Sequence, residues 1–330
     1  MSARAKSDGT RIDPAVFTAL TEAGLNPATV AHVVGRALAE DLADGPDVTT
    51  LATIDADQQG RAEAVPREAG VVAGLPVMAF VFAVVGQGRV SVRITAADGD
   101  IVRPGDVLLT ATGPVRDLLT AERTALNLIT HLSGVATLTR LWTDAVSGTK
   151  AQIRDTRKTM PGLRALEKYA VRCGGGVNHR MSLSDAALIK DNHVAAAGSV
   201  TRAFQLVRAA TPELPIEVEV DTRAQCAEAI EAGAELILLD NMSLADLKAC
   251  VALADGRSVR LEASGGLTLS SAAAVAETGV DFLAVGSLTH SAPVLDIGLD
   301  LHVEDPHLED PHVKDLQDPN MSPHRSGEHH

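Results

Sequence analysis

Between residues 151 and 287 the chain repeats one pattern six times: a short apolar run, then a polar or glycine residue, then a helix-forming segment. Parallel strands that alternate with helices produce this pattern, because helices form the connections and cover both faces of the sheet. The six runs are AQIRD, AALIKD, PIEVEVD, ELILLDN, SVRLEASGG and DFLAVGS. The pattern predicts a parallel α/β domain, which we place over residues 134–301.

The chain before this region predicts helices first. Asp13 is a suitable N-cap and Pro14 suits the first helical position, so we expect a helix over 13–24 and a second over 27–42. Residues 1–12 are polar, and we expect a flexible N-terminus there.

From about 50 to 117, β-prone runs such as GVVAGLPVMAFVFAVV and GRVSVRIT alternate with turn signals, which predicts an antiparallel sheet. An apolar stripe at helical spacing then predicts a long helix over 118–144. Gly134 either bends this helix or marks the passage between two domains. The first domain is therefore expected over 13–133, including part of the long helix.

The last 29 residues, 302–330, are polar and proline-rich and contain EDPH twice, so they predict a disordered tail. The formal charge of −14 and the 2% content of aromatic residues argue against nucleic-acid and anionic-membrane partners. No apolar run is long enough to span a bilayer, and the N-terminus lacks the apolar region of a signal peptide. Three widely spaced cysteines predict reduced thiols in a cytoplasmic protein.

One segment is basic although the chain as a whole is acidic. Residues 150–190 contain nine Lys or Arg against three Asp or Glu. A run of charges usually forms a solvated helical face. Here, however, the cations surround the ends of predicted strands.

Every predicted strand ends at polar or glycine residues that a core would exclude. In α/β barrels the carboxyl ends of the strands and the loops after them form the active site. Six such ends in register predict one site. The residues concerned are Asp155 to Lys158, Lys190 to His193, Glu219 and Asp221, Asp240 and Asn241, Ser264 to Gly266, and Gly286 and Ser287.

The chemistry of this ring suits anions. The cationic side chains of Arg157, Lys158, His179, Arg180 and Lys190 are suited to carboxylates, phosphate or pyrophosphate. The small residues at the ends of the last two strands offer backbone N–H groups that can cradle phosphate. They are Ser264, Gly265, Gly266 and Gly286.

Two carboxylates of the ring, Glu219 and Asp240, are hard oxygen ligands for ribose hydroxyls or Mg²⁺. Glu219 shares a strand face with Glu217, and two carboxylates on one face are rarely buried without a purpose; a role for Glu217 stays open. The fingerprints of dinucleotide-binding and P-loop proteins are missing from the sequence.

At these residues the chain resembles the quinolinate phosphoribosyltransferase family from about 36 to 300. The resemblance is carried by EDLADGPDVTT, AERTALNLITHLSGVAT, DTRKTMPGLRALEKYAVRCGGGVNHRMSLSDAALIKDNH, EVEVDT, ILLDNM, EASGGL and VGSLTHS. It implies an N-terminal α/β sandwich domain and an incomplete α/β barrel of six to seven strands, as in type II phosphoribosyltransferases. It also implies a homodimer with active sites shared between subunits.

The activity that the resemblance implies is phosphoribosyl transfer from phosphoribosyl pyrophosphate to quinolinate, with Mg²⁺, in NAD synthesis. The products are nicotinate mononucleotide, pyrophosphate and CO₂. Quinolinate would be held by Arg157, His179, Arg180 and, from the partner subunit, Arg123. The phosphoribosyl substrate and its metal would be served by Lys158, Lys190, Glu219 and Asp240, and the phosphates by Ser264, Gly265, Gly266, Gly286 and His290.

Two alternatives stay open. A relative with the same fold could transfer phosphoribose to another carboxylated ring, as in the molybdenum-operon branch. A protein of another class, a non-catalytic anion-binding barrel, would not need the set Lys158, Lys190, Glu219 and Asp240.

Overall fold

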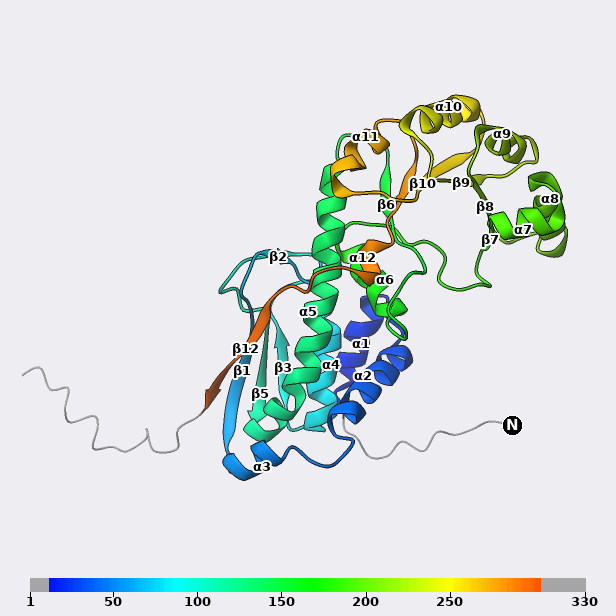
Figure 1. Cartoon of the computed structure of the whole chain (residues 1–330). Helices are drawn as coiled ribbons and strands as arrows, with labels where there is room; N and C mark the ends of the chain where they lie inside the picture. The colour runs from blue at the N-terminus through cyan, green and yellow to red at the C-terminus, as the bar shows by residue number, and fades with distance from the viewer. Residues whose placement is uncertain (1–11, 304–330) are drawn as a thin grey trace, which may run out of the picture.

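The computed structural model of the protein describes residues 12–303. This part of the chain contains a four-stranded antiparallel sheet and a six-stranded parallel sheet, each with helices packed against it. One helix of 31 residues, α5 (Val115–Ala145), runs from the first part into the second (Figure 1). The flexible ends expected from the sequence fall largely on 1–11 and 304–330, which lie outside the described residues.

Three helices precede the antiparallel sheet: α1 (Pro14–Glu22), α2 (Pro27–Asp41) and α3 (Val48–Thr53). Each begins at a side chain that accepts hydrogen bonds from the first turn, and these caps are Asp13, Asn26 and Asp47. Such a cap stabilises a helix by about 1 kcal/mol. The two helices predicted from the sequence, including the cap at Asp13, are confirmed.

The antiparallel sheet has the strand order β12-β1-β5-β3. Its strands are β1 (Gln59–Pro66), β3 (Ser91–Ile94), β5 (Leu109–Pro114) and β12 (Ile297–Val303). Two further short strands, β2 (Gly70–Val71) and β4 (Ile101–Val102), pair only with each other. The sheet lies beside α4 and α5 (Figure 1), so this part is a layer of helices on a layer of strands.

The apolar run from Gly70 to Val85 differs from its prediction as part of the sheet. Only β2 is a strand; after three residues outside any element the run continues as helix α4 (Leu75–Gly86), nine of whose twelve residues are buried. Pro76 sits in the first turn, where its missing N–H costs nothing. A helix buried on all sides shows no amphipathic period, so a continuous apolar run cannot distinguish it from a buried strand.

The end of the described chain also differs from the prediction. Residues 297–301 were expected in the barrel and 302–330 in a disordered tail. Instead, β12 extends through Val303 and pairs with β1 along its whole length, from Ile297 opposite Pro66 to Val303 opposite Gly60. The chain therefore returns to the N-terminal sheet after the barrel and covers an edge of β1 that would otherwise expose unpaired backbone groups.

The six predicted parallel strands are confirmed, in the order β6-β11-β10-β9-β8-β7. They are β6 (Gln152–Arg154), β7 (Ala187–Ile189), β8 (Ile216–Val220), β9 (Leu236–Asp240), β10 (Arg260–Ser264) and β11 (Phe282–Ala284). β6 and β7 are the two edges of this sheet and do not pair with each other; Arg154 of β6 instead forms an isolated parallel bridge with Val177, in the segment after α6. This is an incomplete α/β barrel, as expected.

Helices follow the strands. They are α6 (Arg164–Cys173), α7 (Asp191–Ala197), α8 (Val200–Ala210), α9 (Arg223–Glu231), α10 (Leu244–Ala254), α11 (Ala272–Ala276) and α12 (Ser287–His290), with the 3₁₀ turn η1 (Leu269–Ser271). Helices α8 to α11 lie on the outside of the curved sheet, whereas α6 and α12 lie beside α5 (Figure 1). Within 12–303 no helix is both long and apolar enough to cross a membrane.

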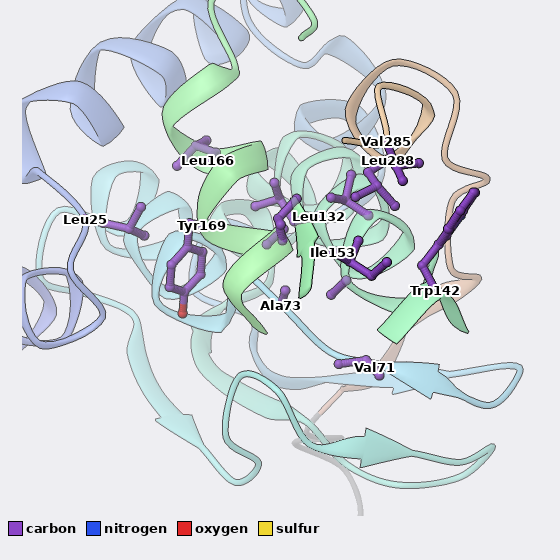
Figure 2. Close-up of a cluster of buried hydrophobic side chains, with 14 of the residues drawn as sticks. Leu25, Val71, Ala73, Leu132, Trp142, Ile153, Leu166, Tyr169, Val285 and Leu288 are labelled. Carbon is purple, nitrogen blue, oxygen red and sulfur yellow. The ribbon is translucent and has the colours of Figure 1, made fainter. Parts of the chain in front are cut away.

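The two parts share one apolar core. Leu132 and Trp142 of α5 lie in a cluster with Leu166 of α6 and Leu288 of α12 (Figure 2). At Gly134 the helix and the returning chain pack closely, because a Cβ there would lie 2.0 Å from the carbonyl oxygen of Pro293. Gly134 therefore sits inside an unbroken helix and lets the returning chain pack against it.

Candidate active site

A cavity of about 420 Å³ lies at the carboxyl ends of the barrel strands. This volume falls in the usual range for small-molecule sites, about 300–1,000 Å³. Its lining residues come from every barrel strand or the loop after it: Thr156, Arg157, Lys158, His179, Arg180, Leu188, Lys190, Glu219, Leu238, Asp240, Glu262, Ser264 and Ala284.

Strand periodicity explains which residues point inward. Every second side chain of a strand lies on the same face, so β9 contributes Leu238 and Asp240 and β10 contributes Glu262 and Ser264. The last inward residue of each strand lies near the mouth, and the one before it lies deeper in the barrel. The site therefore has a polar rim and a buried floor.

Four cations line the cavity: Arg157, Lys158, Arg180 and Lys190. The ammonium of Lys190 pairs with Glu219. Arg157 and Arg180 form no ion pair within the described residues, and the Nε–H of each is buried without an acceptor there. Burial, and then the charge of Arg157, lowers the pKa of Arg180. Arg157 and Arg180 thus bring two partly desolvated positive charges together without a negatively charged partner among the described residues.

The segment that carries these cations is held by a buried ion pair. The ammonium of Lys168 contacts Oδ1 of Asp155, and both side chains are fully buried. Lys168 also donates to the carbonyl oxygen of His179 (2.9 Å), and the His179 backbone N–H donates to Asp155 (2.8 Å). Asn178 donates to the other Asp155 oxygen (2.5 Å). Asp155 therefore connects the start of the β6 loop to the segment of His179 and Arg180.

Two residues that line the cavity, His179 and Glu262, belong with Arg154 and Glu217 to a largely buried group of four ionisable side chains, here called the floor cluster. Arg154 Nη1 lies 2.5 Å from Glu262 Oε2 and 3.9 Å from Glu217 Oε1. His179 Nε2 lies 2.7 Å from Glu217 Oε2 and 3.8 Å from Glu262 Oε1. One guanidinium thus faces two carboxyl groups, with an imidazole between them.

Protonation in the floor cluster follows from burial. Burial lowers the pKa of His179 to about 4, so its imidazole is neutral near pH 7. The His179 Nδ1 accepts from the backbone N–H of Arg180 (2.7 Å), which leaves the proton on Nε2, facing Glu217. Burial raises the pKa of Glu217, and burial followed by the charge of Glu217 raises the pKa of Glu262 to about 7.

The glycines predicted for phosphate binding lie at the same end of the barrel. Gly265 has φ +89°, and a Cβ there would lie 2.2 Å from Oδ1 of Asn241. Asn241 also has a positive φ (52°), and its N–H donates to the carbonyl oxygen of Ser264 (2.9 Å). A Cβ at Gly286 would lie 3.1 Å from Cδ of Lys158 and 3.4 Å from Nε2 of His290. Only small residues allow these loops to meet.

Glu219 and Asp240 fit the chemistry of a magnesium site. They line the cavity, and they also line a second hollow of about 290 Å³ together with Asp191 and Asp221. Mg²⁺ prefers carboxylate and phosphate oxygens and usually keeps only one or two protein ligands. Within 12–303 the only group of three close ligand atoms is instead His179, Glu217 and Glu262, where Arg154 already supplies the positive charge.

The structure brings eight predicted site residues around the cavity: Arg157, Lys158, His179, Arg180, Lys190, Glu219, Asp240 and Ser264. Gly265 and Gly266 continue the Ser264 loop, and Gly286 lies beside both Lys158 and His290. Arg123 is exposed on α5 and is not among the residues lining this cavity.

Thr156, which belongs to the predicted strand end Asp155 to Lys158, also lines the cavity. Sequence reasoning missed four lining residues: Leu188, Leu238, Glu262 and Ala284. Glu262 had a usable signal, because it lies two residues before Ser264 and so shares the inward face of β10.

Comparisons with known proteins agree with this geometry. The family described as "Quinolinate phosphoribosyl transferase, C-terminal domain" matches residues 135–300, and its N-terminal counterpart matches 47–133. A carboxylating nicotinate-nucleotide pyrophosphorylase of Mycobacterium leprae is 56% identical over 271 residues, which are 81% of this chain and 95% of the relative.

Solved structures are similar along the same length. NadC from Streptococcus pyogenes is 41% identical with a TM-score of 0.81, covering 85% of this chain and 99% of that one. The nicotinate-nucleotide pyrophosphorylase of Francisella tularensis is 38% identical with a TM-score of 0.80, covering 85% and 98%. The chain belongs to the quinolinate phosphoribosyltransferase family.

Proposed function

We propose that the protein transfers phosphoribose from phosphoribosyl pyrophosphate to quinolinate and releases CO₂ and pyrophosphate, giving nicotinate mononucleotide for NAD synthesis. The observation that carries this proposal is the pair Arg157 and Arg180, whose buried Nε–H groups have no acceptor within the described residues. A buried donor without a partner costs about 1–3 kcal/mol, more for a charged group. A planar dicarboxylate would satisfy both guanidinium groups at once.

On the acceptor side, Arg157 and Arg180 bind the two carboxylates, joined by Arg123 of a second subunit. His179 serves this site indirectly. Both of its ring nitrogens are engaged within the protein, Nδ1 by Arg180 and Nε2 by Glu217. We therefore assign His179 to the positioning of Arg180 rather than to a direct bond with quinolinate.

On the donor side, Lys158 and Lys190 face the phosphoribosyl pyrophosphate. Glu219 and Asp240 hold the ribose hydroxyls and a Mg²⁺ ion, which would neutralise charge on the pyrophosphate. The remaining residues offer small side chains, backbone N–H groups or an imidazole to the phosphates, and these are Ser264, Gly265, Gly266, Gly286 and His290.

The chemistry requires no protein nucleophile. Departure of pyrophosphate leaves an oxocarbenium-like carbon that the ring nitrogen attacks, so orientation and stabilisation of the leaving charge supply most of the acceleration. Lys158 and Lys190 line the cavity, which supports assigning that stabilisation to them. After transfer the ring nitrogen is positively charged, and it stabilises the carbanion that loss of CO₂ leaves on the adjacent carbon.

The assembly we propose is a homodimer in a cytoplasmic setting. Arg123 lies outside its own cavity on the exposed side of α5, which suits a role in a neighbouring site. The three cysteines within the described residues are free thiols, as expected in a reducing compartment.

The test is product analysis with quinolinate and with nicotinate. We expect pyrophosphate and CO₂ to appear together, only when quinolinate and phosphoribosyl pyrophosphate are both present. Nicotinate lacks one carboxylate and leaves buried cations unpaired, so its kcat/KM should be lower by roughly 10⁴-fold. Comparable turnover of nicotinate would indicate another ring specificity, and binding without turnover would indicate an anion-binding barrel.

A further inference from the structure

The floor cluster has a charge imbalance that the proposed chemistry does not use. Arg154 carries one positive charge, His179 is neutral, and Glu217 and Glu262 together could carry two negative charges. Glu217 and Glu262 are 4% and 0% exposed. A second buried negative charge without a partner is far more costly than a neutral acid. The balance favours one proton on the two carboxyl groups.

The hydrogen bonds indicate where this proton sits. Oε2 of Glu262 accepts from Arg154 and Oε2 of Glu217 lies beside His179 Nε2, so these two oxygens are engaged. The remaining oxygen of each, Oε1, is buried without a hydrogen-bond partner within 12–303. A proton on Glu262 Oε1 makes it a donor, and one carboxyl oxygen each of Glu217 and Glu262 lie within 4.8 Å of each other.

We propose that Glu262 is a positioning residue of the acceptor site, held as a neutral acid that donates to Glu217. Through Glu217 it holds the Nε2–H tautomer of His179, whose Nδ1 fixes the backbone of Arg180. When Glu262 is neutral, the charges of Arg154 and Glu217 cancel each other. The two positive charges of Arg157 and Arg180 then remain available to bind a dianion. This inference rests on the proposed function, because quinolinate is taken as the dianion.

The surroundings of Glu262 support this assignment. Arg154 of β6 and Glu217 of β8 face it, with Glu219 further along β8. His179 and Arg180 approach from the segment after α6, and the buried pair Lys168–Asp155 lies behind His179. The neighbours in register on β9 and β11, Leu238 and Phe282, are apolar.

The direction of the pH effect follows from the sign of the charges. If Glu262 ionises, the floor gains a negative charge beneath the bound dicarboxylate and repels it. Binding of the dianion therefore raises the pKa of Glu262 above its value of about 7 in the free protein. Quinolinate carboxylates are fully ionised above about pH 6, so they contribute no proton change of their own. Binding should take up a proton at pH 8 and almost none at pH 6.

The experiment compares the wild-type protein with Glu262→Gln and Glu235→Gln. Glutamine keeps an uncharged donor toward Glu217 and an acceptor for Arg154 but has no proton to exchange. Glu235 is exposed at the start of β9 and serves as the matched control. KM for quinolinate is measured from pH 5.5 to 9, and proton uptake by calorimetry of quinolinate binding in buffers of different ionisation enthalpy.

For the wild type and Glu235→Gln we expect KM to rise above pH 7, up to about tenfold per pH unit for one proton. For Glu262→Gln the rise and the proton uptake should be lost. Uptake that persists in Glu262→Gln, or a wild-type KM independent of pH, overturns the inference even if quinolinate is turned over. If Glu262→Gln does not fold, the pH dependence of KM and the proton uptake of the wild type alone test the inference. Failure of the wild type to use quinolinate instead contradicts the proposed function.

Discussion

Individual cations of the segment 150–190 serve three different purposes. Arg157, Lys158, Arg180 and Lys190 line the cavity, Arg154 neutralises the floor, and Lys168 is buried beneath the segment. The excess of positive charge in the sequence correctly indicated that cations gather at the carboxyl ends of the barrel strands. It could not separate the residues that line the cavity from those that support them, because cations of both kinds alternate along the same short segment.

The support by Lys168 gives a stability prediction. Lys168→Met removes the partner of a fully buried carboxylate, so we expect the free energy of unfolding to fall by about 3–5 kcal/mol. Lys150→Met is the matched control, because Lys150 pairs with Asp281 at the surface, and its loss should cost at most about 1 kcal/mol. Urea unfolding measures both, and similar small losses would show that Asp155 does not depend on Lys168.

The floor cluster shows what the alternation of residues along a strand can and cannot predict. Glu217 was noticed because it alternates with Val218 and shares a face with Glu219. The same alternation holds for Glu262 and Ser264, yet one carboxylate between apolar neighbours is a weak signal. The structure makes it significant by placing strands β8 and β10 on opposite sides of β9, so that Glu217 and Glu262 meet across the barrel interior.

At the scale of elements, prediction succeeded where two signals agreed. The six barrel strands combine an apolar run of the right length with a polar end and a following helix, and all six are confirmed. Helix α4 and strand β12 were missed for physical reasons. The apolar run of α4 has no period because every side of the helix is covered, and β12 is specified by its pairing with β1, which is more than 200 residues distant.

Helix α5 offers a test of such long-range packing. Gly134→Ala raises helix propensity, but its Cβ would meet the Pro293 carbonyl oxygen at 2.0 Å. We expect a net loss of stability of about 1–3 kcal/mol from overpacking. Gly35→Ala in α2, where no atom lies within 4 Å of the new Cβ, should stabilise by about 0.5–1 kcal/mol. Thermal unfolding of both variants measures these changes in stability, and a stabilised Gly134→Ala would contradict the close contact with Pro293.

At the scale of the whole molecule, α5 determines which residues reach a site. Its C-terminal half packs against α6 and α12 of its own barrel, whereas its N-terminal half lies beside the antiparallel sheet (Figure 1). Arg123 is exposed on that N-terminal half, one residue before Thr124, which lines a separate hollow with α2. In a two-fold dimer the same surface of each subunit can serve the other, so both sites could be completed together.

Mixing two inactive variants tests this arrangement. Arg123→Ala and Lys158→Ala are each expected to be nearly inactive as homodimers. In a mixed dimer one site takes Lys158 from the Arg123→Ala chain and Arg123 from the other, and is whole. Random reassociation makes about half of the dimers mixed, each with one whole site of two, so roughly a quarter of wild-type activity should return.

The matched control mixes Lys158→Ala with Arg157→Ala. Both side chains line the cavity of their own barrel, so every site in a mixed dimer keeps one lesion and no activity should return. Recovery in the first mixture alone places Arg123 in the neighbouring site. If the first mixture stays inactive while exchange of differently tagged chains shows that mixed dimers have formed, Arg123 acts within its own subunit and the shared site is wrong.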